Sequence, residues 1–127
     1  MSKYVLDASA LLALLNAETG AGLVQELLPE ALISTVNLAE VVTRLALLGM
    51  PGDEIRDALT LLGLETVPFV EEQAYRSGFL VRQTQALGLS LGDRACLALA
   101  SMKGLTVVTA DRAWKEAGVE VEVRVIR

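Results

Sequence analysis

Residues 4–15 read YVLDASALLALL, in which one carboxylate, Asp7, separates two apolar runs. An unpaired carboxylate in a low-dielectric interior is strongly unfavourable, so a segment that looks buried should not contain one. Residues 3–7 are nevertheless typical of a buried strand, and residues 8–16 are typical of a helix. The first question that the sequence raises is therefore why Asp7 stands at this junction.

Short β-branched runs continue to alternate with helical patterns along the rest of the chain. Strands are predicted at residues 31–35, 64–69, 105–110 and 119–127. Helices are predicted at residues 19–28, 36–48, 52–63, 71–87 and 90–104. Thr19 is the expected N-cap of the first of these helices, and the alternating pattern of the last strand predicts a sheet edge. Strands separated by helices favour parallel pairing, so we expect an α/β fold with five strands and helices on both faces.

The chain contains no repeat, low-complexity tract or linker, so a single domain is expected over residues 1–127. Hydrophobic residues make up 53% of the sequence, which raises the question of membrane insertion. No apolar stretch reaches the roughly 18 to 20 residues that span a bilayer. Charged residues interrupt the candidates: Glu26, Glu40, Arg44 and Asp57. Since no secretory leader pattern is present either, we expect a cytoplasmic protein with no membrane partner.

The residue types exclude several classes of chemistry. The chain has one cysteine, Cys96, and no histidine, which excludes His/Cys zinc sites, Ser-His-Asp triads and Cys-His dyads. The formal net charge of -5 and the pI near 4.7 argue against nonspecific binding to nucleic acid, which normally requires a basic surface. Any catalysis must therefore use carboxylates, hydroxyls, Lys or Arg.

Four acids occupy related places in the predicted fold: Asp7, Glu40, Asp93 and Asp111. Asp7 and Asp111 stand at or just after the ends of predicted strands, whereas Glu40 and Asp93 lie in the first turns of helices. In open α/β sheets, ligands bind outside the carboxyl ends of the strands. We therefore expect the four carboxylates to point into one crevice.

These acids also have a purely structural interpretation, because acids near helix N-termini satisfy free N–H groups. Two pairs have the spacing of a capping box: Ser90 with Asp93, and Asn37 with Glu40. Capping does not explain why the two strongest strand patterns, YVL and TVV, both run into aspartate. Four converging carboxylates would repel one another unless a cation neutralised them, and Mg²⁺ or Mn²⁺ suits such oxygen ligands.

Four segments resemble those of PIN-domain nucleases, and among these the VapC-type toxins of toxin-antitoxin modules: VLDASALLALL, STVNLAEVVTRL, LSLGDRACLALA and LTVVTADRAW. The resemblance covers nearly the whole chain. It implies a three-layer α/β/α sandwich with a central, mainly parallel five-stranded sheet. It also implies an Mg²⁺- or Mn²⁺-dependent ribonuclease whose catalytic and metal-binding residues are Asp7, Glu40, Asp93 and Asp111.

The resemblance assigns further roles beside these acids. Ser9 and Thr109 match hydroxyl positions that support the acidic cluster, although hydroxyls at these positions also suit turns and caps. Cys96 stands one turn after Asp93, where some relatives have a further acid. Four carboxylates and no fifth are therefore expected.

Metal-assisted phosphodiester hydrolysis needs no histidine, because the bound ion lowers the pKa of a water and neutralises the developing charge. The phosphates of the backbone still need donors. Arg44, Arg94 and Arg112 lie close in sequence to the acids, where they either bind phosphate or form surface ion pairs. The sequence leaves both roles open.

The leucine-rich helices LLALL, LVQELL and VVTRLALL indicate either a partner surface or ordinary core. By resemblance, the expected partners are an RNA substrate, a second copy in a homodimer and a small cognate antitoxin in an apolar groove.

Other α/β families fit the sequence less well. Phosphoacceptor receiver domains need an acidic pair in the first loop and a late lysine, whereas here no lysine follows residues 105–110 until Lys115. Haloacid-dehalogenase-like phosphatases need an aspartate where this chain has Ser9. Two alternatives stay open, a non-catalytic PIN-like module that binds a partner and a PIN nuclease that acts in RNA processing.

Overall fold

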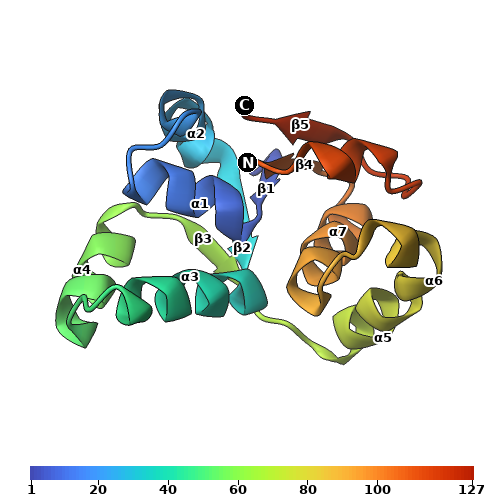
Figure 1. Cartoon of the computed structure of the whole chain (residues 1–127), viewed down its shortest axis with the longest axis horizontal. Helices are drawn as coiled ribbons and strands as arrows, with labels where there is room; N and C mark the ends of the chain where they lie inside the picture. The colour runs from blue at the N-terminus through green and yellow to red at the C-terminus, as the bar shows by residue number, and fades with distance from the viewer.

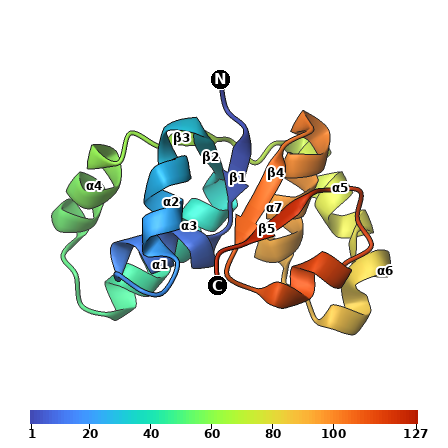
Figure 2. The same cartoon turned by 90° about the horizontal axis from the view of Figure 1, so that it is seen from above.

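The computed structural model describes residues 1–127 and contains one sheet of five parallel strands (Figures 1 and 2). The strands are β1 (Tyr4–Leu6), β2 (Ala31–Ser34), β3 (Glu65–Val67), β4 (Thr106–Thr109) and β5 (Val123–Val125). Their order in the sheet is β3-β2-β1-β4-β5, so β1 is central and β5 lies at an edge, as its alternating sequence predicts. The predicted α/β class and five-stranded parallel sheet are confirmed.

Helices cover both faces of this sheet. They are α1 (Ala8–Leu15), α2 (Ala21–Leu27), α3 (Thr35–Leu47), α4 (Gly52–Leu61), α5 (Glu71–Phe79), α6 (Val81–Thr84) and α7 (Leu91–Lys103). Short 3₁₀ turns are η1 (Leu28–Glu30), η2 (Gln85–Leu87) and η3 (Arg112–Glu116). Figure 1 shows α1 to α4 on one side of the sheet and α5 to α7 on the other, which is the three-layer sandwich expected. No helix combines the length and the apolarity needed to cross a membrane.

The hydrophobic core lies on both sides of the strands because successive strand residues point to opposite faces. Val5, Leu32 and Val107 are buried in one cluster together with residues of α7. Their chain neighbours Leu6 and Val108 are buried in a second cluster with residues of α1 and α2. Burial on both faces explains why these strands are almost purely apolar, and with them the high mean hydropathy of the chain.

Two boundaries differ from the sequence prediction. Thr19 is not the N-cap of α2, which is Gly20 at φ 98 with no side-chain cap bond, so that prediction is wrong. Gly20 is required there, since a Cβ would lie 2.8 Å from the side chain of Ile126. The single helix predicted over residues 71–87 is divided into α5, α6 and η2, in a segment that includes the poor helix formers Gly78 and Thr84.

The topology decides where the acidic residues meet. The chain runs from β1 outward to β2 and β3 and then returns to place β4 on the other side of β1. The strand order therefore reverses between β1 and β4, and crevices at the carboxyl ends of such neighbouring strands are the usual ligand sites of open α/β sheets. Asp7 directly follows β1, and Asp111 follows β4 after one intervening residue.

Candidate functional site

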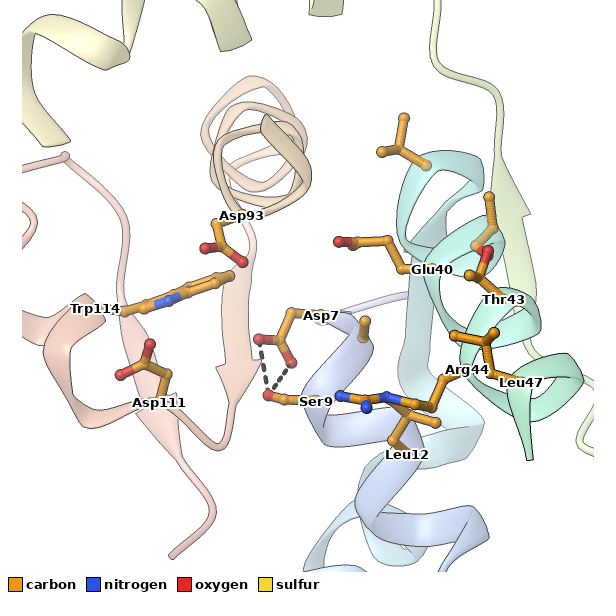
Figure 3. Close-up of a pocket in the computed structure, with 13 residues that line it drawn as sticks. Asp7, Ser9, Leu12, Glu40, Thr43, Arg44, Leu47, Asp93, Asp111 and Trp114 are labelled. Atoms are coloured by element: carbon orange, nitrogen blue, oxygen red, sulfur yellow. Dashed lines mark hydrogen bonds between the residues drawn. The ribbon is translucent and has the colours of Figure 1, made fainter. Parts of the chain in front are cut away.

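A cleft of about 710 Å³ lies at the carboxyl ends of β1 and β4, and all four predicted acids line it: Asp7, Glu40, Asp93 and Asp111. In Figure 3, the side chains of Glu40 on α3 and Asp93 on α7 point toward one another from opposite walls. Asp7 extends into the space between these walls from the β1–α1 junction (Figure 3). Four residues that are distant in sequence thus share one cavity.

Asp7 is buried and accepts several hydrogen bonds at the β1–α1 junction. Its side chain is only 4% exposed. The hydroxyl of Ser9 donates to Oδ1 at 2.7 Å, and the N–H of Ala10 donates to the same oxygen at 2.8 Å. The hydroxyl of Thr109 donates to Oδ2 at 2.6 Å. These bonds fix the orientation of the carboxylate.

The same two hydroxyls connect β1 to the loop after β4. Ser9 Oγ accepts the N–H of Ala110 at 2.9 Å, and Thr109 Oγ1 accepts the N–H of Asp111 at 3.0 Å. Each hydroxyl therefore donates to Asp7 and accepts from the backbone that leads into Asp111. Ser9 and Thr109 lie where supporting residues of an acidic cluster were expected.

Burial raises the pKa of Asp7 from 3.8 to about 6. This value is the net result: burial is the largest cause and the negative charge of Asp93 adds to the rise, whereas the hydrogen bonds from Thr109, Ala10 and Ser9 oppose it. No cation offsets the desolvation, because the ion pairs of the chain lie elsewhere: Lys3–Glu30, Arg76–Glu72 and Arg127–Glu18. A desolvated carboxylate without a cationic partner is typical of a functional site.

The capping interpretation is correct for the three aspartates. Asp7 caps α1, Asp93 forms a capping box with Ser90, and Asp111 Oδ1 accepts the N–H of Ala113 at 3.0 Å to cap η3. Capping and exposure to the cleft are compatible, because Asp93 uses only Oδ2 for its cap and Asp111 only Oδ1. The other carboxylate oxygen of each remains available for a ligand.

The capping box predicted for Asn37 and Glu40 is wrong. Helix α3 begins at Thr35 with Ser34 as its N-cap, so Asn37 lies inside the helix. Its Nδ2 donates instead to Glu40 Oε1 at 2.8 Å and to the carbonyl of Gly92 at 3.0 Å. Asn37 therefore contacts one of the acids directly and joins α3 to the first turn of α7.

Electrostatics separate three of the acids from the fourth. Burial raises the pKa of the Cys96 thiol well above its usual value, and the charges of Asp7, Asp93 and Glu40 raise it further. Asp111 does not contribute to this shift. In Figure 3 the ring of Trp114 lies between the side chains of Asp93 and Asp111. Asp111 thus stands at the rim of the site, beyond the indole.

The residues present fit a hard divalent cation held partly through water. Carboxylate oxygens are the ligands that Mg²⁺ and Mn²⁺ prefer. However, no three acidic side chains are gathered closely enough to form a ready-made metal cage. Mg²⁺ usually keeps several of its waters and binds through one or two carboxylates, so a shared cleft does not require direct contact with every acid.

The structure places the three candidate arginines differently. Arg44 lines the cleft and forms no ion pair, whereas Arg94 turns toward α5 and donates from Nη1 to the carbonyl of Ser77 at 2.8 Å. Arg112 donates from Nε to the carbonyl of Arg127 at 2.9 Å and lines an adjoining pocket. None of the three is in an ion pair, so that interpretation is wrong for them. Arg44 and Arg112 remain beside the acids, and Arg94 does not.

Sequence reasoning did not identify several residues that line the cleft or contact its acids. Trp114, which is 2% exposed, forms part of its wall. The apolar residues that α1 and α3 contribute to the cleft are Ala8, Leu12, Val36, Ala39 and Leu47. The signal for Asn37 was its position three residues before Glu40, because residues at i and i+3 are neighbours on the surface of a helix. An isolated glycine inside a helix pattern, directly before Asp93, was the signal for Gly92.

Solved structures with a similar fold include a toxin-antitoxin complex from Klebsiella pneumoniae, with a TM-score of 0.74 and 22% identity over 98% of each chain. DNA-bound VapBC from Salmonella typhimurium has a TM-score of 0.72 and 18% identity over 100% of each chain. FitAcB from Neisseria gonorrhoeae has a TM-score of 0.70 and 21% identity, covering 94% of this chain and 95% of that one. At these identities, the likeness establishes the fold.

No curated protein matches the sequence. The family model that describes the PIN domain matches residues 4–120, which is nearly the whole chain and includes all four acids of the cleft. This chain therefore belongs to the PIN domain family.

Proposed function

We propose that this chain is an Mg²⁺- or Mn²⁺-dependent ribonuclease that hydrolyses RNA phosphodiester bonds and acts as the toxin of a toxin-antitoxin pair. One observation carries the proposal. Asp7 is desolvated, has no cationic partner and lies in a cleft with three further carboxylates. Membership of the PIN family supports the nuclease, and the fold shared with toxin-antitoxin complexes supports the toxin subclass.

A divalent cation bound here would lower the pKa of a coordinated water and neutralise charge that develops on the phosphate. Asp7, Glu40 and Asp93 are the residues that would hold it, directly or through water. Asp111 lies at the rim, where its free oxygen would orient the attacking water or contribute to a second ion site. Ser9 and Thr109 keep the Asp7 carboxylate in a fixed orientation.

Two arginines supply donors for the RNA backbone in this proposal. Arg44 stands one helical turn after Glu40, lines the cleft and has no acidic partner. Arg112 directly follows Asp111, and its terminal guanidinium nitrogens form no hydrogen bond within the chain. Guanidinium groups recognise phosphate oxygens through paired hydrogen bonds.

Nuclease activity is tested with purified chain and a structured RNA in Mg²⁺, in Mn²⁺ and in EDTA. We expect cleavage in both metals, none in EDTA, and none by Asp7→Asn in any condition. The matched control is Asp57→Asn, an exposed acid on α4, which should cleave like wild type. Cleavage that continues in EDTA or in Asp7→Asn would overturn the proposal.

Metal binding has a second readout that does not depend on activity. Trp114 is the single tryptophan of the chain and lines the cleft, so its fluorescence should change on titration with Mn²⁺. The change should be lost in Asp7→Asn. If wild type cleaves no RNA and shows no response to Mn²⁺, the alternative of a non-catalytic, partner-binding module is favoured.

The partner proposal rests on apolar surface at the end of α3. The leucines of the first two leucine-rich segments, LLALL and LVQELL, are half-buried or buried and serve as core. In contrast, Leu47 at the end of α3, its C-cap Leu48, and Leu61 on α4 are exposed. A groove of about 450 Å³ between α3 and α4 is lined largely by apolar side chains: Leu38, Val42, Ile55, Leu59, Leu62 and Leu64. We propose that a small antitoxin binds in this groove and that the toxin is a homodimer.

The toxin subclass is tested in cells. Expression of this chain alone should arrest growth, and co-expression of the protein encoded by the adjacent reading frame should restore it. Growth that continues, while purified protein still cleaves RNA, would favour the alternative of a PIN nuclease in RNA processing. Size-exclusion chromatography with light scattering should give the mass of two copies.

A further inference from the structure

We propose that Asn37 and Gly92 form a clasp that positions Glu40 for metal binding. In this arrangement Asn37 is a positioning residue, because it acts through Glu40 and contacts neither metal nor substrate. The inference rests on the proposed function, since it concerns how one carboxylate of that site is held. Its basis is a set of contacts that join α3 and α7 at the side chain of Glu40.

The first contact is the amide of Asn37. Its Nδ2 donates one hydrogen bond to Glu40 Oε1 at 2.8 Å and the other to the carbonyl of Gly92 at 3.0 Å. Both donors of the amide are therefore used, one on the acid and one on the opposite helix. Because Gly92 directly precedes Asp93, this single side chain connects the segments that carry two of the acids.

The carbonyl of the same amide indicates that Asn37 has more than a packing role. Asn37 is 1% exposed, and its Oδ1 has no hydrogen-bond partner. A buried acceptor without a partner is unfavourable, and an apolar side chain of similar volume would avoid that penalty. The feature that an apolar residue would lack is the pair of Nδ2 bonds. One of these is made to the acid itself.

Gly92 forms the other half of the clasp. A Cβ at this position would lie 2.5 Å from both carboxylate oxygens of Glu40, so the side chain of Glu40 rests directly on the backbone of α7. Gly22, Gly52 and Gly78 also lie in α-helices, and a Cβ at each would meet nothing within 4 Å. Among these helical glycines, only Gly92 has a side chain in the space that a Cβ would occupy, and that side chain is Glu40.

Glu40 needs such support because of its surroundings. Glu40 is exposed to solvent and forms no ion pair, and its side chain faces Asp93 across the cleft (Figure 3). A long side chain with free rotamers would turn away from like charge into solvent. The clasp opposes this rotation from two sides, through a hydrogen bond from Asn37 and through the backbone surface at Gly92.

The test uses Asn37→Leu, which removes the hydrogen bond, and Gly92→Ala, which displaces Glu40 from the opposite side. Both variants keep all four acids. Wild type and variants are titrated with Mn²⁺ while the fluorescence of Trp114 is followed, and melting in EDTA is recorded. We expect Mn²⁺ affinity to fall about 10- to 100-fold in each variant, the range typical for residues that orient metal ligands. The melting temperature in EDTA should stay at the wild-type value or rise, and kcat should fall while KM for RNA changes little.

Matched controls are available on α5. Gln73→Leu removes another buried amide with an unpartnered oxygen, and Gly78→Ala fills another helical glycine. Unlike Asn37, Gln73 forms no hydrogen bond to an acid of the cleft, and unlike Gly92, a Cβ at Gly78 would meet nothing within 4 Å. Both controls should bind Mn²⁺ like wild type. If Asn37→Leu does not fold, Gly92→Ala decides the matter, because alanine favours the helix.

The outcomes separate the two proposals. If wild type binds Mn²⁺ and both clasp variants bind it equally well, the clasp is wrong and the proposed function stands. If wild type does not bind Mn²⁺, the proposed function fails and the clasp fails with it. Weaker binding in both clasp variants, with unchanged binding in the controls, supports the clasp.

Discussion

The β1–α1 and β4–η3 junctions have the same local design and different chemistry. In each, a buried strand leads into an aspartate that caps the following helical turn, Asp7 through the N–H of Ala10 and Asp111 through the N–H of Ala113. Asp7 is nonetheless 4% exposed with a pKa raised to about 6, whereas Asp111 is exposed. A cap motif therefore fixes the backbone of such a junction but not the solvent exposure of its acid.

The difference arises from what packs behind each junction. Helix α1 has three buried residues and packs against α2 and α3, and Asp7 at its N-cap is buried as well. The turn η3 has one buried residue, Trp114, and leaves Asp111 at the rim of the cleft. Thr109 connects the two junctions, since its hydroxyl donates to Asp7 and accepts from the N–H of Asp111.

The largest expected effect is on catalysis. Asp7→Asn should lower the rate of Mg²⁺-dependent RNA cleavage more than about 100-fold, because it removes a ligand rather than a residue that orients one. Asp111→Asn should lower it about 10-fold, since Asp7, Glu40 and Asp93 remain. Single-turnover cleavage assays measure both. Equal losses in the two variants would contradict the distinction between the junctions.

The second effect is on stability in EDTA. A pKa raised from 3.8 to about 6 corresponds to about 3 kcal/mol between the two protonation states of Asp7. Above pH 6 the carboxylate of Asp7 is ionised in the folded and unfolded states, so its desolvation lowers the free energy of unfolding by the full amount. As the pH falls toward 4 the folded state takes up the proton first, and the penalty disappears.

Wild type should therefore gain up to about 3 kcal/mol in free energy of unfolding relative to Asp7→Asn between pH 7 and pH 4. At pH 7 Asp7→Asn should be the more stable protein, since Asn caps a helix about as well as Asp. Urea unfolding of both proteins at several pH values measures this difference. If the free energies of unfolding of wild type and Asp7→Asn change with pH in parallel, Asp7 is not desolvated in the folded state.

Thr109→Val tests the connection between the junctions. Loss of the hydroxyl should lower the free energy of unfolding by about 1 to 2 kcal/mol, because Thr109 is buried and makes two hydrogen bonds. It should also reduce activity about 10-fold and raise the pKa of Asp7 further, since this hydrogen bond lowers it. Thr109→Ser keeps the hydroxyl and should retain the wild-type pH profile. A Thr109→Val profile that matches wild type would exclude a role for the connection.

The smallest effect is expected for the stability of Asp111→Asn. Asp111 is exposed and Asn preserves its cap, so the free energy of unfolding should change by less than about 0.5 kcal/mol. Urea unfolding at pH 7 in EDTA measures it beside Asp7→Asn. A rise in the free energy of unfolding as large as that of Asp7→Asn would mean that the two aspartates are destabilising to the same extent.

Local pattern was sufficient to predict the five strands, most of the helices, the parallel sheet and the places of the four acids. These features depend on hydrophobic periodicity and on residues next to each other in the chain. The capping box of Ser90 and Asp93 was predictable for the same reason. The division of the helix at residues 71–87 was not predicted, because the apolar pattern continues across it while Gly78 and Thr84 weaken the helix.

Only the tertiary structure decided how the acids differ. The sheet order places β4 beside β1, so that Thr109 reaches Asp7 across 102 residues of sequence. The fold likewise brings Asn37 to the carbonyl of Gly92 across 55 residues. Desolvation and hydrogen bonds of this kind depend on what surrounds a side chain in space, which no short stretch of sequence specifies. The sequence by itself thus determined which acids lie at the carboxyl ends of the strands, and tertiary packing determined that Asp7 among them is buried and desolvated.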